Sequence, residues 1–128
     1  KEVKLRRLWL LLARSEWLKA SEIFDSYSME TIQKPDSLLF FLYGCWLFAT
    51  EEASIGEIHF SEVLKRSTPS LNSLLIHYLH KNKDEEEYLK RLFFWEKKQL
   101  YRQAILYSHC RENQLNKKIF QKKLQELS

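Results

Sequence analysis

Two histidines three residues apart, His77 and His80, form the pattern that most resembles a metal site in this chain of 128 residues. On a helix this spacing places both imidazoles on nearly the same face. A zinc site needs three or four ligands, and no cysteine or carboxylate stands at a spacing that completes the set. His109 and Cys110 begin 29 residues after His80. The sequence therefore predicts two partly exposed histidines and no bound metal.

Residues for nucleophilic or phosphoryl-transfer chemistry follow no known signature. The chain has no Gly-x-Ser-x-Gly turn and no kinase or hydrolase motif. Its two glycines, Gly44 and Gly56, are 12 residues apart, which excludes the glycine-rich loops that bind dinucleotides or phosphates. Carboxylates at 51–52 and 85–87 fall near expected helix starts, where the helix dipole favours them. We expect no catalytic residue and no cofactor.

Cys45 and Cys110, the two cysteines, both stand in apolar, helix-like surroundings. Free cysteine behaves as a small hydrophobic residue, so we expect two buried thiols in a reducing compartment. No signal peptide is recognisable. The uncharged run 37–50 has 14 residues and no run is longer, which is fewer than the roughly 20 that a membrane helix needs. We therefore expect a cytoplasmic protein without membrane insertion, in which this run forms a buried core helix.

The elements that must carry these residues are helices, because apolar side chains recur at helical spacing along nearly the whole chain. Leu5, Leu8, Trp9 and Leu12 illustrate the pattern. The expected helices span residues 2–14, 16–27, 37–50, 54–65, 71–80, 84–98, 99–112 and 115–127. Connections are short, so consecutive helices should be antiparallel neighbours. The predicted fold is all-α, an antiparallel stack of about eight helices in helical hairpins.

Particular residues mark where these helices begin and how they pack. Asp36 or Ser37 is a good N-cap for the third helix. Ser54 and Glu57 match a capping box for the fourth. Four consecutive large apolar residues, 92–95, cover every side of a helix, which predicts that the sixth is sandwiched between neighbours. The whole chain, 1–128, reads as one domain, and its start at Lys1 suggests a piece of a larger protein.

One window, residues 37–69, contains a spaced set of small and large residues. Gly44 is followed 12 residues later by Gly56, then by Phe60 four residues on, and finally by Pro69. This order resembles the tetratricopeptide repeat (TPR), in which small residues let two helices cross closely and a large one fills the gap to the next hairpin. Val63 departs from it, because the family prefers Ala there. Another α-α repeat or a non-repetitive bundle remains open.

The resemblance implies a non-catalytic protein–protein interaction module, a scaffold whose first helices line a concave groove. A peptide or a partner helix would dock in that groove. Such modules are often appended to signalling enzymes, including bacterial Ser/Thr kinases, and to secretion or chaperone machinery. The predicted groove residues come from the first, third and fifth helices: Leu5, Trp9, Leu12, Phe41, Cys45, Phe48, Asn72, Leu75 and Leu79.

The surplus of apolar residues on the first and third helices has two interpretations. Either both helices are covered on two sides within the domain, or part of their apolar surface is exposed and is covered when a partner binds. We favour the second for the face bearing Trp9, Phe41 and Phe48. On that hypothesis Phe41→Glu abolishes partner capture and leaves the melt nearly unchanged.

The charge distribution leaves two other functions open. Residues 81–128 carry 12 Lys and Arg against 7 Asp and Glu, a net +5, whereas residues 1–80 carry −1. A basic half can favour nucleic acid, but the excess predicts only weak, salt-sensitive binding. A nucleic-acid-binding helical module and a purely structural spacer are therefore the alternatives. The oligomeric state and the partner's identity do not follow from the sequence.

Overall fold

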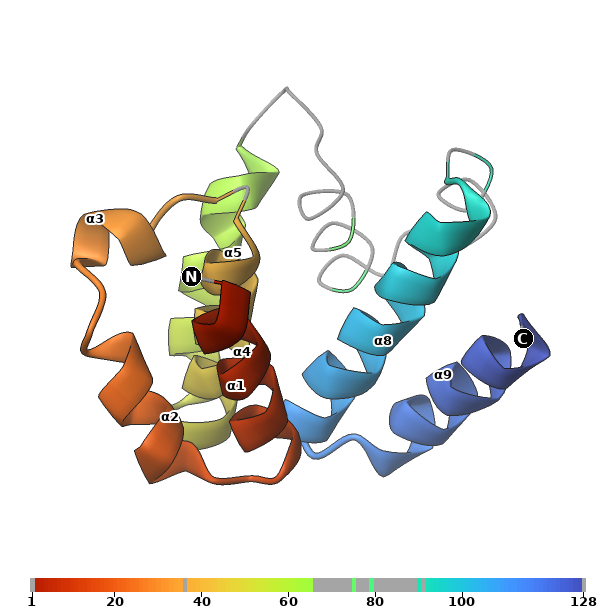
Figure 1. Cartoon of the computed structure of the whole chain (residues 1–128), viewed down its shortest axis with the longest axis horizontal. Coiled ribbons are helices and arrows are strands. Elements are labelled where there is room, and N and C mark those ends of the chain that lie inside the picture. The colour runs from red at the N-terminus through yellow and green to blue at the C-terminus, as the bar shows by residue number, and fades with distance from the viewer. Residues whose placement is uncertain are drawn as a thin grey trace.

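The computed structural model describes residues 2–35, 37–65 and 92–127, together with Leu75, Leu79 and Lys90. This part of the chain is all helical and contains no strand, which confirms the predicted all-α class. Its seven helices are α1 (Glu2–Ala13), α2 (Trp17–Phe24), α3 (Met29–Ile32), α4 (Leu38–Thr50), α5 (Ala53–Leu64), α8 (Phe94–Cys110) and α9 (Gln114–Glu126) (Figure 1). None of these helices is both long and apolar enough to cross a lipid bilayer.

Helix α4 lies at the centre and packs against α1, α2, α3, α5 and α8. Helices α8 and α9 form a hairpin on one side of it, and α8 also contacts α1 (Figure 1). Short turns join α1 to α2, α4 to α5 and α8 to α9. Ser15 and Glu112, in the first and last of these turns, have positive φ angles of 59° and 57°. The described part of the chain therefore consists mainly of three helical hairpins, and α4, which belongs to one of them, also contacts the other two.

The central position of α4 follows from its sequence. A helix that is hydrophobic all round must be buried all round, and 37–50 is the uncharged run noted above. Ser37 caps it, because the Ser37 hydroxyl accepts a hydrogen bond from the Phe40 N–H at 3.1 Å. Both the buried helix and its N-cap were predicted correctly. The buried residues are Leu39, Phe40, Phe41, Leu42, Gly44, Cys45, Leu47 and Phe48.

The α4–α5 hairpin is held by two glycine–phenylalanine contacts. A Cβ added at Gly44 would lie 2.9 Å from Phe60 Cδ1 and closer still to two other ring carbons. A Cβ added at Gly56 would lie 2.8 Å from Phe48 Cδ1. Phe60 itself is fully buried. This packing is therefore consistent with two predictions. The glycines permit a close helix crossing, and Phe60 fills a gap.

Two local predictions about helix starts were wrong. Helix α5 begins at Ala53 with Glu52 as N-cap and no side-chain capping bond, so Ser54 lies inside the helix. The apolar pattern lapses over 28–36, yet a short helix, α3, forms there because the Ser28 hydroxyl accepts from the Thr31 N–H at 3.2 Å. A serine cap needs only a local serine and no long apolar stripe.

The expected helices 84–98 and 99–112 meet inside a single helix, α8, which runs from Phe94 to Cys110. No glycine or proline stands near residue 98 to end a helix there. The start of α8 is set by Glu96, whose carboxylate accepts a hydrogen bond from the Phe93 N–H at 2.8 Å. Residues 84–89, and all of the expected helix 71–80 except Leu75 and Leu79, lie outside the described residues.

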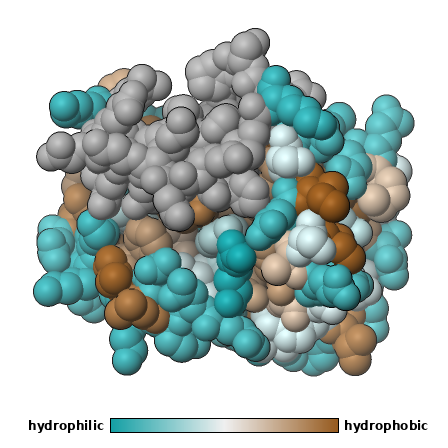
Figure 2. Space-filling view, turned by 180° about the vertical axis from the view of Figure 1, so that it is seen from behind, coloured by the Kyte–Doolittle hydropathy of each residue, from teal (hydrophilic) through white to brown (hydrophobic). Residues whose placement is uncertain are grey.

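The predicted sandwiching of residues 92–95 is also wrong. Phe93, Phe94 and Trp95 are 70%, 56% and 64% exposed. Phe93 precedes the helix, and the next two residues occupy its first turn. Hydrophobicity on every side predicted burial, but burial also requires neighbours on every side. Figure 2 shows that apolar side chains elsewhere also reach the surface, in groups separated by hydrophilic ones.

Candidate functional site

The predicted groove residues divide between the core and the surface. Leu12, Phe41, Cys45 and Leu75 have no exposed surface, and Phe48 is 9% exposed. These five belong to the hydrophobic core and do not form a surface groove. Leu5, Trp9 and Leu79 are partly buried and pack against that core, and Asn72 lies outside the described residues. The third expected helix corresponds to α4. Of the two interpretations of its apolar surplus, the buried side chains favour coverage within the domain over a surface left open for a partner.

The aromatic side chains of α4 are engaged in internal packing. Phe41 stacks on Phe60 with ring centroids 6.0 Å apart. Phe48 packs against Phe60 and Tyr107, each at 5.6 Å. The Arg111 guanidinium lies 4.3 Å above the Phe48 ring and donates to the Tyr107 hydroxyl at 2.8 Å. This cluster joins α4, α5 and α8, so a partner cannot reach Phe41 in this fold.

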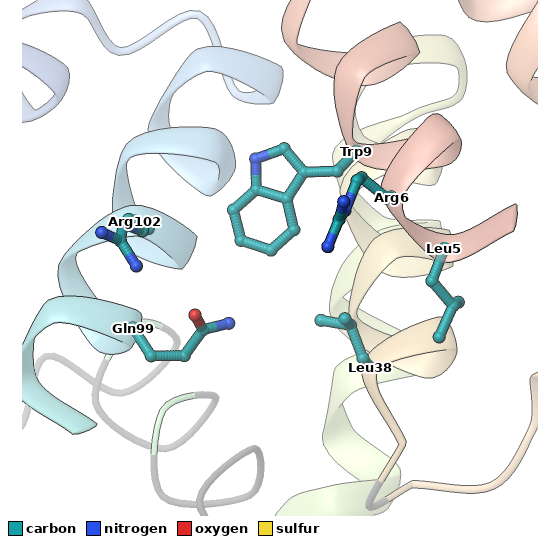
Figure 3. Close-up of a pocket in the computed structure, with 6 residues that line it drawn as sticks. All are labelled: Leu5, Arg6, Trp9, Leu38, Gln99 and Arg102. Carbon is teal, nitrogen blue, oxygen red and sulfur yellow. The ribbon is translucent and has the colours of Figure 1, made fainter. Parts of the chain in front are cut away.

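A groove does open between α1, α4 and α8. It is a cavity of about 390 Å³ lined by Leu5, Arg6, Trp9, Leu38, Gln99 and Arg102. Figure 3 shows Trp9 projecting from α1 with Arg6 beside it, while Gln99 and Arg102 line the opposite wall on α8. We call these six residues the α1–α8 groove. The sequence identified Leu5 and Trp9 as partner-facing but missed the other four.

The described part of the groove lining is cationic. It contains Arg6 and Arg102 and no acidic residue. Within the described part of the chain, neither arginine makes a hydrogen bond or an ion pair. Arg111 differs from both, because it contacts two aromatic rings and lies 4.0 Å from a Glu57 oxygen. The only sequence signal for the α8 wall was the four- and three-residue spacing of Trp95, Gln99 and Arg102, which places them on one helical face.

Ser15 and His109 resemble a nucleophile and its base, since Ser15 Oγ lies 2.9 Å from His109 Nε2. The opposite ring nitrogen, Nδ1, lies 3.1 Å from the ammonium of Lys117. An ammonium can only donate, so Nδ1 accepts and the proton resides on Nε2, which donates to the serine. Burial and then Lys117 lower the pKa of His109. The arrangement ties the α1–α2 turn to α8 and α9 and does not activate Ser15.

Cys45 and Cys110 are buried free thiols, as the sequence predicted. They lie on the neighbouring helices α4 and α8. Burial, followed by contact with Cys110, raises the pKa of Cys45. Both thiols belong to the hydrophobic core, and because thiolate is the reactive form of cysteine, the raised pKa makes Cys45 a poor nucleophile.

A second cavity, of about 530 Å³, lies where α3, α4 and α5 meet. Met29, Ile55 and Ile58 line it and are 54%, 42% and 67% exposed. Its described lining includes the ionisable residues Tyr43, His59 and Glu62 and contains no Lys or Arg. The described residues contain no group of three His, Cys, Asp or Glu side chains that could hold a metal ion. His77 and His80 lie outside the described residues.

The chain is similar to part of a known kinase. Over 121 residues it is 42% identical to Serine/threonine-protein kinase PknD of Protochlamydia amoebophila (strain UWE25). The match covers 94% of this chain and 12% of the kinase, so the chain spans about an eighth of that relative's length. No protein-family model and no solved structure matches the chain.

Proposed function

We propose that this chain is a non-catalytic protein-interaction module, an accessory segment of a larger signalling protein such as a serine/threonine kinase. The observation that carries this proposal is the extent of the match, in which nearly the whole chain aligns with 12% of PknD. The chain also lacks the glycine-rich loop and the catalytic Asp motifs that phosphoryl transfer by protein kinases requires. Both observations support a role beside a catalytic domain.

The proposed architecture is a stack of helical hairpins similar to tetratricopeptide repeats. The mutual packing of Gly44 with Phe60 and of Gly56 with Phe48 supports it, since close helix crossing at small residues is what the resemblance implies. Two unpaired thiols support placement in the cytoplasm. The α1–α8 groove is the proposed contact surface for a peptide or a partner helix.

Deletion of the aligned segment from PknD tests the accessory role. The segment is replaced by a flexible Gly/Ser linker of equal length, and autophosphorylation and phosphorylation of a generic protein substrate are measured with the purified variant. We expect both activities to persist, because the segment holds no catalytic group. Loss of both in a variant whose kinase domain still binds ATP and melts cooperatively would contradict the proposal.

Isolated protein tests the interaction role. Wild-type chain is compared with Trp9→Glu in the groove and Leu18→Glu on α2, where Leu18 is 85% exposed. Some purified kinase substrates or regulators are expected to bind the wild type. We expect these proteins to bind Leu18→Glu as tightly as the wild type and to bind Trp9→Glu weakly. Equal binding by both variants would remove the groove from the interaction.

A nucleic-acid-binding module is the second candidate, because Phe93, Phe94 and Trp95 are exposed near lysines. Lys98 Nζ lies 4.9 Å from the Phe94 ring centroid, and exposed aromatics beside cations can stack single-stranded bases. Fluorescence anisotropy with single-stranded RNA over a salt series tests it. We expect weak binding that vanishes near physiological salt, and submicromolar affinity there would favour this candidate. A spacer would bind neither RNA nor protein.

A further inference from the structure

The two walls of the α1–α8 groove carry their arginines from distant parts of the chain. Arg6 stands on α1 and Arg102 on α8, 96 residues later in the sequence. Both are exposed and both line the same cavity (Figure 3). A guanidinium presents a planar fork of donors that matches a carboxylate or a phosphate. The groove therefore offers two anion-binding groups that face one space.

The remaining lining is mainly apolar. Leu5 and Leu38 lie on the same side as Arg6, and the Trp9 indole projects from α1 into the space between the two walls (Figure 3). Trp95, 64% exposed, extends the α8 face beyond Gln99 by helical spacing. Aromatic side chains that stay partly exposed beside arginines are the residue types that anchor protein partners. A ligand that fits must supply an apolar side chain together with its negative charge.

The charge of the α1–α8 groove distinguishes between two classes of anionic partner, nucleic acids and acidic peptides. Binding to the backbone of a nucleic acid depends on many cations that contact successive phosphates, whereas the described lining holds two cations beside Gln99 and three apolar side chains. Among the described residues, the second cavity, at α3, α4 and α5, has Glu62 in its lining and no lysine or arginine, so the groove is the better candidate for an anionic ligand. The combination at the α1–α8 groove fits an acidic peptide with embedded hydrophobic residues.

We propose that the α1–α8 groove docks an acidic peptide segment of a partner protein, with its carboxylates on Arg6 and Arg102 and a large apolar side chain against Trp9. This inference rests on the proposed interaction function and specifies the partner that the function requires. The unpaired state of both arginines in the described part of the chain leaves their donors free for such a ligand.

The test uses fluorescein-labelled synthetic peptides and the whole chain. One peptide alternates Asp and Glu with Phe and Leu. A second replaces the acidic residues by Lys, and a third replaces Phe and Leu by Ser. We expect the first peptide to bind most tightly, and Arg6→Glu/Arg102→Glu to weaken it by about tenfold or more, because a charge reversal replaces attraction by repulsion. The same variant should bind the lysine peptide better than the wild type does.

Arg7→Glu is the matched control, since Arg7 is exposed on α1 and does not line the groove. It changes the net charge as Arg6→Glu does, so equal weakening by both single variants would overturn the groove assignment. Equal affinity for the acidic and lysine peptides, or tighter binding of a single-stranded oligonucleotide than of any peptide, would also overturn it. Circular dichroism melts verify that the exposed-site variants remain folded.

Failure here is distinguishable from failure of the proposed function. Partner proteins that bind the wild type and Arg6→Glu/Arg102→Glu equally would overturn the acidic-peptide groove and leave the interaction role standing. Loss of catalysis in the PknD deletion would contradict the accessory role, whatever the peptides do.

Discussion

The ring of Phe60 occupies the space that a side chain at Gly44 would fill. The same relationship recurs in reverse, since the ring of Phe48 lies against Gly56. Each helix of the α4–α5 hairpin thus contributes one glycine and, four residues later, one phenylalanine. This reciprocity lets the two helices approach closely while both rings stay packed.

Gly44→Ala is expected to destabilise the protein by about 1–3 kcal/mol, the usual range for overpacking. Phe60 is fully buried and cannot shift easily away from the new methyl group. Gly56→Ala should cost less, because Phe48 lies nearer the surface. The gain of about 0.5–1 kcal/mol that alanine has over glycine within a helix offsets both losses to the same extent. Urea unfolding measures both. A neutral Gly44→Ala, or a larger loss at Gly56, would contradict the packing.

Phe60→Ala is expected to lower the free energy of unfolding by about 3–5 kcal/mol, the range for a buried phenylalanine. Phe94→Ala is the matched control, since Phe94 is 56% exposed, and it should change stability by no more than about 0.5 kcal/mol. Urea unfolding of both variants makes the comparison. A loss under about 1 kcal/mol at Phe60 would fall below the range for core residues and would remove it from the core.

Phe41→Glu is now expected to unfold the protein, contrary to the prediction that the melt would stay nearly unchanged. Phe41 has no exposed surface, and an unpaired buried carboxylate is strongly unfavourable. Leu18→Glu places the same charge on an exposed position of α2 and should leave the thermal melt close to that of the wild type. Cooperative unfolding of Phe41→Glu near the wild-type melting temperature would show that Phe41 is accessible after all.

Stability should fall as the pH drops below about 6.5, the ordinary pKa of histidine. His59 is buried, and its Nε2–H donates to the Phe40 carbonyl at 2.8 Å. Burial lowers its pKa, and the pKa of His109 is lowered in the same direction. The unfolded chain therefore takes up protons at a higher pH than the folded chain, which favours unfolding. The loss levels off once the pH is below the lowered pKa values.

Urea unfolding at several pH values between 7.5 and 5.5 measures this dependence. His59→Gln keeps a polar side chain but cannot titrate, so its stability should depend less on pH than that of the wild type. His109→Gln should reduce the dependence by a smaller amount, because His109 is only partly buried. Stability that is constant or rises toward pH 5.5 would contradict the assignment.

The thiols of Cys45 and Cys110 should react with Ellman's reagent only when the protein opens. They are 0% and 1% exposed, and burial raises the pKa of Cys45, so the native state holds little accessible thiolate. Labelling in buffer should be far slower than in urea. Rapid stoichiometric labelling of native protein would show that α4 and α8 separate readily.

Local signals were sufficient for much of the fold. The uncharged run 37–50 predicted a buried helix, Ser37 predicted its start, and the spacing of Gly44, Gly56 and Phe60 predicted a close contact. Each depends on residues within one helix or one hairpin, so short-range geometry decides the outcome. The boundary predicted between 98 and 99 was wrong because the periodicity on both sides belongs to one continuous helix.

The sequence by itself determined that this protein is helical, that α4 is buried and that its thiols pack as hydrophobic residues. Only the tertiary structure decided which apolar side chains remain at the surface. Phe41 is covered because α5 packs over α4, whereas Trp9 borders a groove because α8 does not close onto α1 there. Arg6 and Arg102 line the same groove because helix packing brings two distant segments of the chain together. Helical periodicity predicts which residues share a face of each helix, but it does not predict which neighbour that face will contact.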